Sequence, residues 1–524
     1  MKLWSFYLTL SLLMLSGVSG VGSDLRLVDA VKKADKTAVN TLIKQRADVN
    51  AAEPDGSTAL LWAARADDLA TVDQLVRAGA NAKTANRYGV TPLNLACTNG
   101  NGAMVELLLK SGADPNTAKP DGETVLMTAS RTGKVEAVKP LLVKGANVNA
   151  KENTNGQTAL MWAAAEGNAD VIRLLLEFGA DVHARSNGLG GFTPLLFAAR
   201  EGRIEAAKAL LKGGADLNET LQLRRGDRTD GQMIILATRA ARGGAAGAPG
   251  GPPVNNNPNA FFLAVANAHY ELALALVDAG VDPNAAPAGY TALHQITWVR
   301  KTGIGDNEKG VPKGSGKVTS LEFVKELVKR GANVNARVTV RRPPMGTTRL
   351  NALGATPMLL AGRTADAPLM RLLGQLGADP LLPNEDGTTP ILVAAGVGAR
   401  SDGEDPGSEP EMVEAIKVAL DLGANINDVD KNGDTVMHGV CNKFTALGLG
   451  GADLVNLLAA KGAKIEVWNK PNKAGLTPLA IVGQVFEGDP PGRAAIRKLM
   501  VAAGVSTDLS TTRSERPRYV PAPQ

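Results

Sequence analysis

Residues 428–433 are the place where this chain comes closest to a metal site. Their Asp-x-Asp-x-Asn-Gly spacing is that of the opening of a calcium-binding loop, whose oxygen ligands surround the ion. Such a loop also needs a bidentate Glu at its twelfth position, and Gly439 stands there. The pattern therefore predicts an ordinary polar turn without a metal ion.

Residues 310–317, Gly-Val-Pro-Lys-Gly-Ser-Gly-Lys, suggest a phosphate-binding loop at first sight. That motif needs Gly where Val311 stands, and Ser or Thr where Val318 follows the lysine. No strand pattern precedes the segment. It is predicted to be a flexible insertion that binds no cofactor.

The remaining residues capable of chemistry are scattered. His183, His269, His294 and His438 show no metal-ligand spacing, and no nucleophile-elbow sequence occurs. His294 and His438 follow Thr at a fixed distance and are expected to make structural hydrogen bonds. Cys97 and Cys441 occupy a position that elsewhere is a small Ala, so both are predicted to be buried free thiols. We expect neither a catalytic nor a metal site, and therefore no enzyme.

The sequence segments around these residues repeat along the chain. The phrase Gly-x-Thr-(Pro/Ala)-Leu returns in related forms about every 33 residues. Its threonines are Thr58, Thr91, Thr124, Thr158, Thr193, Thr291, Thr356, Thr389, Thr435 and Thr477. A second phrase, Gly-Ala-Asx, follows most of them, as at residues 79–81 and 112–114, and degenerate forms such as Gly462-Ala463-Lys464 follow the others. This period predicts a solenoid, a fold that more often binds than catalyses.

Each phrase has a structural role in beginning or ending a helix. Thr is a good N-cap, because its hydroxyl accepts a free backbone N–H of the first turn. Pro92 and its counterparts suit the first helical position, where a missing N–H costs nothing. A short first helix, a turn and a second helix follow, and Gly79 or its counterpart ends the second helix. Each unit is thus two helices and a projecting β-turn.

These phrases resemble the ankyrin repeat, whose signature is Thr-Pro-Leu-His-x-Ala at a period of 33. The resemblance implies an all-α repeat solenoid with about twelve repeats over residues 24–506. Residues 24–218 would hold repeats one to six and residues 260–506 repeats seven to twelve. Between them, residues 219–259 are a Gly-, Pro- and Asn-rich insertion, and residues 507–524 are a polar tail predicted to be disordered.

The second half departs from the regular period. Residues 301–319, 397–410, 442–451 and 483–492 lengthen the connection between the two helices of a repeat. Because this connection always emerges on the same edge of a solenoid, we predict a ledge of loops along one edge.

The amino terminus indicates export. Lys2 precedes an apolar run from Leu3 to Leu15, and small residues follow, so residues 1–20 are predicted to be a cleaved signal peptide. The protein would then lie outside the cytoplasm, in the periplasm or the medium. An uncleaved membrane anchor is the alternative, because the first 23 residues contain no charge after Lys2. The formal charge of +5 on 524 residues is too small and too scattered for a nucleic-acid surface.

The function implied by the resemblance is non-covalent protein binding through a concave surface, by a monomeric scaffold without a cofactor. Two alternatives remain: a secreted effector that binds proteins of a host or competitor, and an enzyme or small-ligand binder using the loop ledge. Trp, Tyr and Arg dominate binding hot spots. At positions that the resemblance places on the turn or the concave surface, the contact candidates are Tyr88, Phe192, Tyr290, Trp298, Arg65, Arg131 and Arg200. Trp62 and Trp162, in contrast, are expected to fill the core.

Overall fold

The computed structural model describes residues 24–187, 190–222, 257–301, 311–341, 343, 345, 348–399, 407–444, 451–483 and 491–507. The predicted signal peptide, most of the 219–259 insertion and all but the first residue of the tail lie outside these ranges. The chain divides into two compact units, Met1–Ala184 and Arg185–Gln524. This boundary precedes the insertion that the sequence analysis placed between the two halves.

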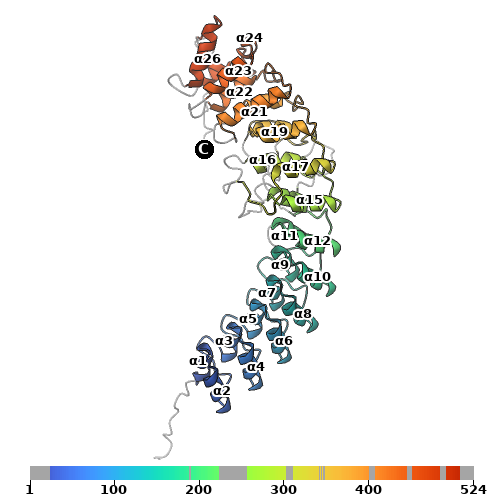
Figure 1. Ribbon diagram of the computed structural model, residues 1–524, viewed down its shortest axis with the longest axis vertical. Helices are drawn as coiled ribbons and strands as arrows, with labels where there is room; N and C mark the ends of the chain where they lie inside the picture. The colour runs from blue at the N-terminus through green and yellow to red at the C-terminus, as the bar shows by residue number, and fades with distance from the viewer. Residues whose placement is uncertain are drawn as a thin grey trace, which may run out of the picture. The chain divides into compact units, whose positions relative to one another are not determined.

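The N-terminal unit consists of two layers of helices (Figure 1). The first helices of successive repeats form one layer: α1 (Arg26–Lys32), α3 (Ala59–Arg65), α5 (Pro92–Asn99), α7 (Val125–Thr132) and α9 (Ala159–Glu166). The second helices form the other layer: α2 (Lys36–Lys44), α4 (Leu69–Arg77), α6 (Gly102–Lys110), α8 (Val135–Val143) and α10 (Ala169–Glu177). Each first helix packs on the second helix of its own repeat, and neighbouring helices of a layer pack on one another from α1 to α9 and from α4 to α10.

The C-terminal unit continues the pairing. Its first helices are α11 (Pro194–Arg200), α14 (Ala260–Ala266), α16 (Ala292–Arg300), α18 (Pro357–Arg363), α20 (Pro390–Ala394), α22 (Val436–Phe444) and α25 (Pro478–Gly483). Its second helices are α12 (Ile204–Lys212), α15 (Tyr270–Asp278), α17 (Ser320–Lys329), α19 (Ala367–Gln375), α21 (Glu409–Asp421), α23 (Ala452–Ala460) and α26 (Pro491–Ala502). The short α24 (Ile465–Trp468) precedes the last pair. The described residues contain isolated β-bridges but no strand, so the fold is an all-α repeat solenoid.

The recurrent Thr begins the first helices, as predicted. Thr58, Thr91 and Thr124 have extended backbones, and each side chain accepts a hydrogen bond from the N–H three residues on. Proline occupies the first turn of α5, α11, α18 and α20. Small and aliphatic residues then fill the core, where Leu93, Ala96 and Cys97 of α5 are all fully buried.

An asparagine clamp, which the sequence analysis missed, joins consecutive repeats. The Asn50 side chain donates to the Gly79 carbonyl (3.2 Å) and accepts from the Asn81 N–H (2.8 Å). It therefore caps the end of the next repeat's second helix, where Gly79 takes a left-handed φ of 93°. The same clamp is made by Asn116, Asn149, Asn284, Asn335 and Asn427. Its signal was present in the sequence as Asx-x-Asn directly after the second helix.

The two ends of the 219–259 insertion meet. Thr220 and Asn259 form an antiparallel bridge, and the Leu221 N–H donates to the Pro258 carbonyl (3.0 Å). Helix α11 consequently packs directly on α14, although the insertion separates them in sequence. The core of the C-terminal unit is thus continuous across this site.

The described flanks of the long interhelix connections lie against the turn of the preceding repeat. The Lys317 N–H donates to the Glu271 carboxylate (2.6 Å) at the start of α15. A Cβ on Gly407 would stand 2.7 Å from that of Ala365, in the turn between α18 and α19. The Gly451 N–H donates to Glu409 (3.0 Å). The central residues of these connections lie outside the described ranges, so the ledge itself remains a prediction.

Candidate functional site

The structure divides the predicted contact residues into two groups. Tyr88 is 56% exposed, Arg65 and Arg131 are exposed, and Arg200 is half-buried. Phe192, Tyr290 and Trp298, in contrast, are only 4%, 6% and 2% exposed. The expectation that these three aromatic side chains point outward is therefore wrong.

Their burial has a local cause. Tyr290 lies between Phe262 and Trp298, with edge-to-face ring separations of 5.9 and 5.1 Å. The long turn of the next repeat folds over this cluster, because the Thr339 N–H donates to the Gly289 carbonyl (2.8 Å). Phe192 packs on Phe197 at 5.1 Å. These rings belong to the core of the C-terminal unit, which favours aromatic pairs of this geometry.

Trp62, expected in the core, instead forms half of an exposed stack. Its ring is half-buried on α3, with the Lys32 ammonium 4.6 Å and the Arg65 guanidinium carbon 5.2 Å from its centre. Glu53 fixes the ring, because its carboxylate accepts from Trp62 Nε1 (2.6 Å) and pairs with Lys32 Nζ (2.8 Å). Arg65 forms no ion pair or hydrogen bond through its guanidinium with the described residues. The ring attracts the Arg65 guanidinium, and the guanidinium keeps its hydrogen-bond donors free of the described residues.

A second stack lies two repeats further along the same layer. Arg131 occupies in α7 the position that Arg65 has in α3, seven residues after the capping Thr. Its guanidinium carbon stands 5.0 Å from the ring centre of Trp162 on the neighbouring α9. This guanidinium also lacks a hydrogen bond to the described residues, and Trp162 Nε1 is buried without a partner. We call the surface of α1, α3, α5, α7 and α9 that carries both stacks the first-helix face.

The carboxylates that precede these helices are already engaged. Glu123 pairs with Lys119 (2.6 Å) and accepts from the Thr128 hydroxyl (2.7 Å). Glu152 accepts three backbone N–H groups of its own turn, at 2.6 to 3.0 Å. None of these three carboxylates, Glu53 included, pairs with Arg65 or Arg131.

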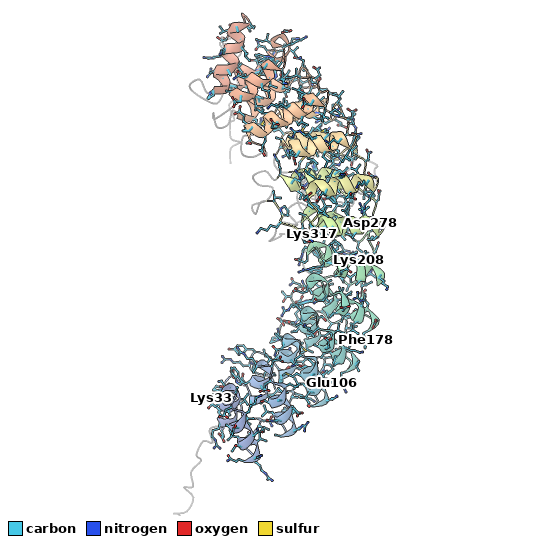
Figure 2. The ribbon with its side chains drawn as sticks, viewed as in Figure 1. Lys33, Glu106, Phe178, Lys208, Asp278 and Lys317 are labelled. Carbon is cyan, nitrogen blue, oxygen red and sulfur yellow. The ribbon has the colours of Figure 1, made fainter. Side chains whose placement is uncertain are left out.

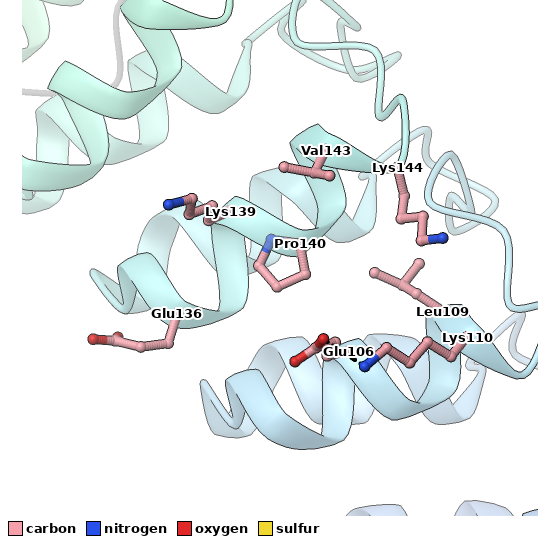
Figure 3. A pocket seen from close by; sticks show the side chains of 8 residues that line it. All are labelled: Glu106, Leu109, Lys110, Glu136, Lys139, Pro140, Val143 and Lys144. Atoms are coloured by element: carbon pink, nitrogen blue, oxygen red, sulfur yellow. Dashed lines mark ion pairs between the residues drawn. The ribbon is translucent and has the colours of Figure 1, made fainter.

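The second-helix layer carries a separate hollow. A cavity of about 300 Å³ opens between α6 and α8, and Figure 3 shows Leu109, Pro140 and Val143 along it. Val143 is 64% exposed, and Phe178 is another exposed apolar side chain of this layer (Figure 2). The cavity rim mixes both signs of charge: Glu106, Lys110, Glu136, Lys139 and Lys144. Glu106 pairs with Lys110 (2.6 Å), which leaves Lys139 and Lys144 beside Glu136 on the rim.

His294 and His438 make structural hydrogen bonds. His294 is fully buried; its Nδ1 accepts from the Thr291 N–H (3.1 Å), and its Nε2 faces the carbonyls of Ala336 (3.0 Å) and Ala355 (3.2 Å). Burial lowers the pKa of His294 to about 4. His438 makes the same contact with Thr435, which confirms the expected hydrogen bonds. Among the described residues there is no cluster of His, Cys, Asp and Glu that could hold a metal ion.

One buried ion pair joins two repeats of the C-terminal unit. Asp366, which caps α19, is fully buried and accepts from Arg300 Nε (2.7 Å) and Nη2 (3.2 Å). Its carboxylate also accepts from the Leu369 N–H (3.2 Å). These hydrogen bonds satisfy the Asp366 carboxylate, so we interpret the ion pair as structural.

Comparison with known proteins agrees with this fold. Residues 27–119 and 126–220 match the family model of ankyrin repeats in three copies. Among solved structures, the crystal structure of the human ASB11 ankyrin repeat domain is similar at 24% sequence identity, with a TM-score of 0.38. The match covers 49% of this chain and 98% of that one. No curated protein matches the chain.

None of the helices in the described ranges combines the length and the apolar composition needed to cross a bilayer. The two segments matched by the family model contain the Arg65–Trp62 stack and the Arg131–Trp162 stack. Ankyrin repeats are general protein-interaction modules, so the candidate site lies within the part of the chain that resembles such a module.

Proposed function

We propose that this protein is a non-catalytic scaffold that binds protein partners through the first-helix face of its N-terminal unit. The observation that carries the proposal is the pair of guanidiniums, Arg65 and Arg131, which are held by stacking on tryptophan and have no hydrogen-bond partner among the described residues. Aromatic and Arg side chains contribute a disproportionate share of binding energy at protein interfaces.

The fixed geometry of the face supports the same role. Glu53 and Lys32 hold Trp62 in place, so less side-chain entropy is lost when a partner arrives. The small residues of each first helix bring neighbouring repeats close and leave little room for a substrate cavity. We further infer that each helix pair from α1/α2 to α25/α26 is one ankyrin repeat, which would give about twelve.

A photocrosslinking experiment tests this function. A benzoylphenylalanine at Thr98, which is exposed on α5 between the two stacks, should capture a partner from an extract of the source organism. The same residue at Lys110, on the second-helix layer, is the matched control. Capture from Lys110 alone would move the binding surface to the other layer, and equal capture from both would indicate non-specific association.

We also propose that residues 1–20 direct export, so that binding takes place outside the cytoplasm. The support is the sequence pattern described above: Lys2, the apolar run to Leu15 and the small residues that follow. Cell fractionation followed by N-terminal sequencing of the mature protein tests it. A mature chain beginning near residue 21 is expected; retention of Met1 in a membrane fraction would favour the anchor instead.

A further inference from the structure

We propose that the first-helix face recognises an extended protein segment carrying two acidic side chains, one paired with Arg65 and the other with Arg131. This inference rests on the proposed scaffold function and names the chemistry of the partner. It does not depend on the ankyrin resemblance, because it follows from contacts within the N-terminal unit.

The inference rests on the contacts of the Arg65 and Arg131 guanidiniums. Each guanidinium carbon lies near a tryptophan ring, 5.2 Å from its centre for Arg65 and 5.0 Å for Arg131, so the attraction between cation and ring restrains the side chain. Neither makes an ion pair with the described residues. A planar fork of free donors matches a carboxylate, which accepts two parallel hydrogen bonds.

The nearby carboxylates do not compete for this role. Glu53 is shared between Lys32 and Trp62, and Glu123 between Lys119 and Thr128. Glu166, an exposed acid at the end of α9, forms no ion pair with Arg131. Trp162 lacks the acceptor that Glu53 supplies to Trp62, and its Nε1 is a buried donor without a partner. The hydrogen-bond donors of Arg131 and Trp162 Nε1 therefore have no acceptor among the described residues.

The spacing of the stacks predicts the spacing of the acids. Arg65 and Arg131 occupy equivalent positions on α3 and α7, with α5 packed between them. Neighbouring packed helices lie 8–10 Å apart, so the two guanidiniums are separated by roughly 16–20 Å. An extended chain rises about 3.3 Å per residue, so the acids should stand about five or six positions apart.

The residues between the stacks favour a protein over a nucleic acid. Leu95 and Thr98 of α5 hold the positions that Trp62 and Arg65 hold in α3, so no cation stands between the two arginines at this register. Nucleic-acid binding depends on neutralising many closely spaced phosphates. Two guanidiniums with no cation between them at this register suit two separate carboxylates on a protein.

Selection of a displayed library of random 16-residue peptides on the full chain tests the inference. Enriched sequences should carry two acidic residues about five or six positions apart. Their synthetic peptides should bind R65Q and R131Q each about tenfold more weakly than wild type, because both variants keep the fold and lose one charged fork. Lys110→Gln, which removes a charge from the second-helix layer, should leave affinity unchanged.

Enrichment of peptides without paired acids, or no enrichment at all, overturns the inference. A change of less than twofold in peptide affinity in both arginine variants also overturns it. The same holds if R65Q and R131Q weaken the binding of a single-stranded oligonucleotide more than the binding of the peptides. The outcome is separable from the scaffold proposal. A partner crosslinked from Thr98 but insensitive to R65Q and R131Q would leave the scaffold standing and remove only the acidic recognition.

Discussion

His294 should make the C-terminal unit sensitive to mild acid. The side chain is fully buried, and its pKa falls from an ordinary 6.5 to about 4 because burial disfavours the charged ring. Above pH 6.5 the ring is neutral in both the folded and the unfolded chain. Between pH 6.5 and pH 4 the unfolded chain binds a proton that the folded chain does not, so stability is lost as the pH falls.

The size of the effect follows from the two pKa values. Each pKa unit corresponds to about 1.4 kcal/mol, so the full loss below pH 4 is about 3 kcal/mol. At pH 5 the linkage relation gives a loss of about 2 kcal/mol relative to pH 7. This is a large share of the net stability of a domain of ordinary size.

Another repeat of the chain shows which residue can replace His294. Asn94 holds the equivalent position in α5, where its side-chain oxygen accepts from the Thr91 N–H (2.9 Å). His294→Asn therefore keeps the capping interaction and removes the titrating group. It leaves the Ala336 carbonyl without its donor, whereas the Ala355 carbonyl still accepts from the Val338 N–H (2.9 Å), so the variant should be less stable than wild type at pH 7 by about 1–3 kcal/mol.

Amide hydrogen exchange of α16, corrected for intrinsic rates, is the appropriate assay because it reports local opening. Between pH 7 and pH 5 the stability advantage of wild type over His294→Asn should shrink by about 2 kcal/mol. His183→Asn, at an exposed histidine of the N-terminal unit, should leave the pH dependence of α16 unchanged. A wild-type advantage that stays constant over this range would refute the reasoning.

The remaining predictions concern packing and backbone geometry. Asp366→Asn should lower the thermal midpoint of the C-terminal unit, at a cost of about 3–5 kcal/mol, because it breaks a buried ion pair. Gly102→Ala should destabilise the N-terminal unit by about 1–3 kcal/mol in urea denaturation, since a Cβ would stand 2.5 Å from a carbonyl oxygen of α8. Arg46→Gly should raise stability by about 1 kcal/mol, because φ is 59° there. Cys97 and Cys441, whose pKa values burial raises, should react with a thiol reagent only after unfolding.

Each of these has a matched control. Asp421→Asn removes an exposed acid from the same unit as Asp366 and should be silent. Gly374→Ala brings a Cβ against the flexible end of Leu422 and should cost less than Gly102→Ala. Arg46→Ala removes the same side chain but keeps the strained backbone, so a gain equal to that of Arg46→Gly would contradict the φ argument. Rapid labelling of the folded protein would contradict the burial of the thiols.

The local signals in the sequence predicted the helices well, because Thr caps, first-turn prolines and terminal glycines act within a few residues. The contact residues were harder to predict. Tyr290 and Trp298 are buried by a segment near Thr339, and no local pattern reveals that this turn folds back. The stack of Arg131 on Trp162 crosses from one repeat to the next. The Arg65–Trp62 stack, by contrast, joins residues three apart on one helix and was accessible from spacing alone.

The asparagine clamp also determines where the solenoid is weakly joined. Lys83 stands where Asn50 stands one repeat earlier, and Leu381 holds the same place after α19. Neither side chain can cap the following helix as asparagine does. Because a repeat protein unfolds according to the strength of each interface between neighbouring repeats, joints of this kind should separate before those that have the clamp. Under a pulling force, the chain would then release groups of repeats in discrete steps.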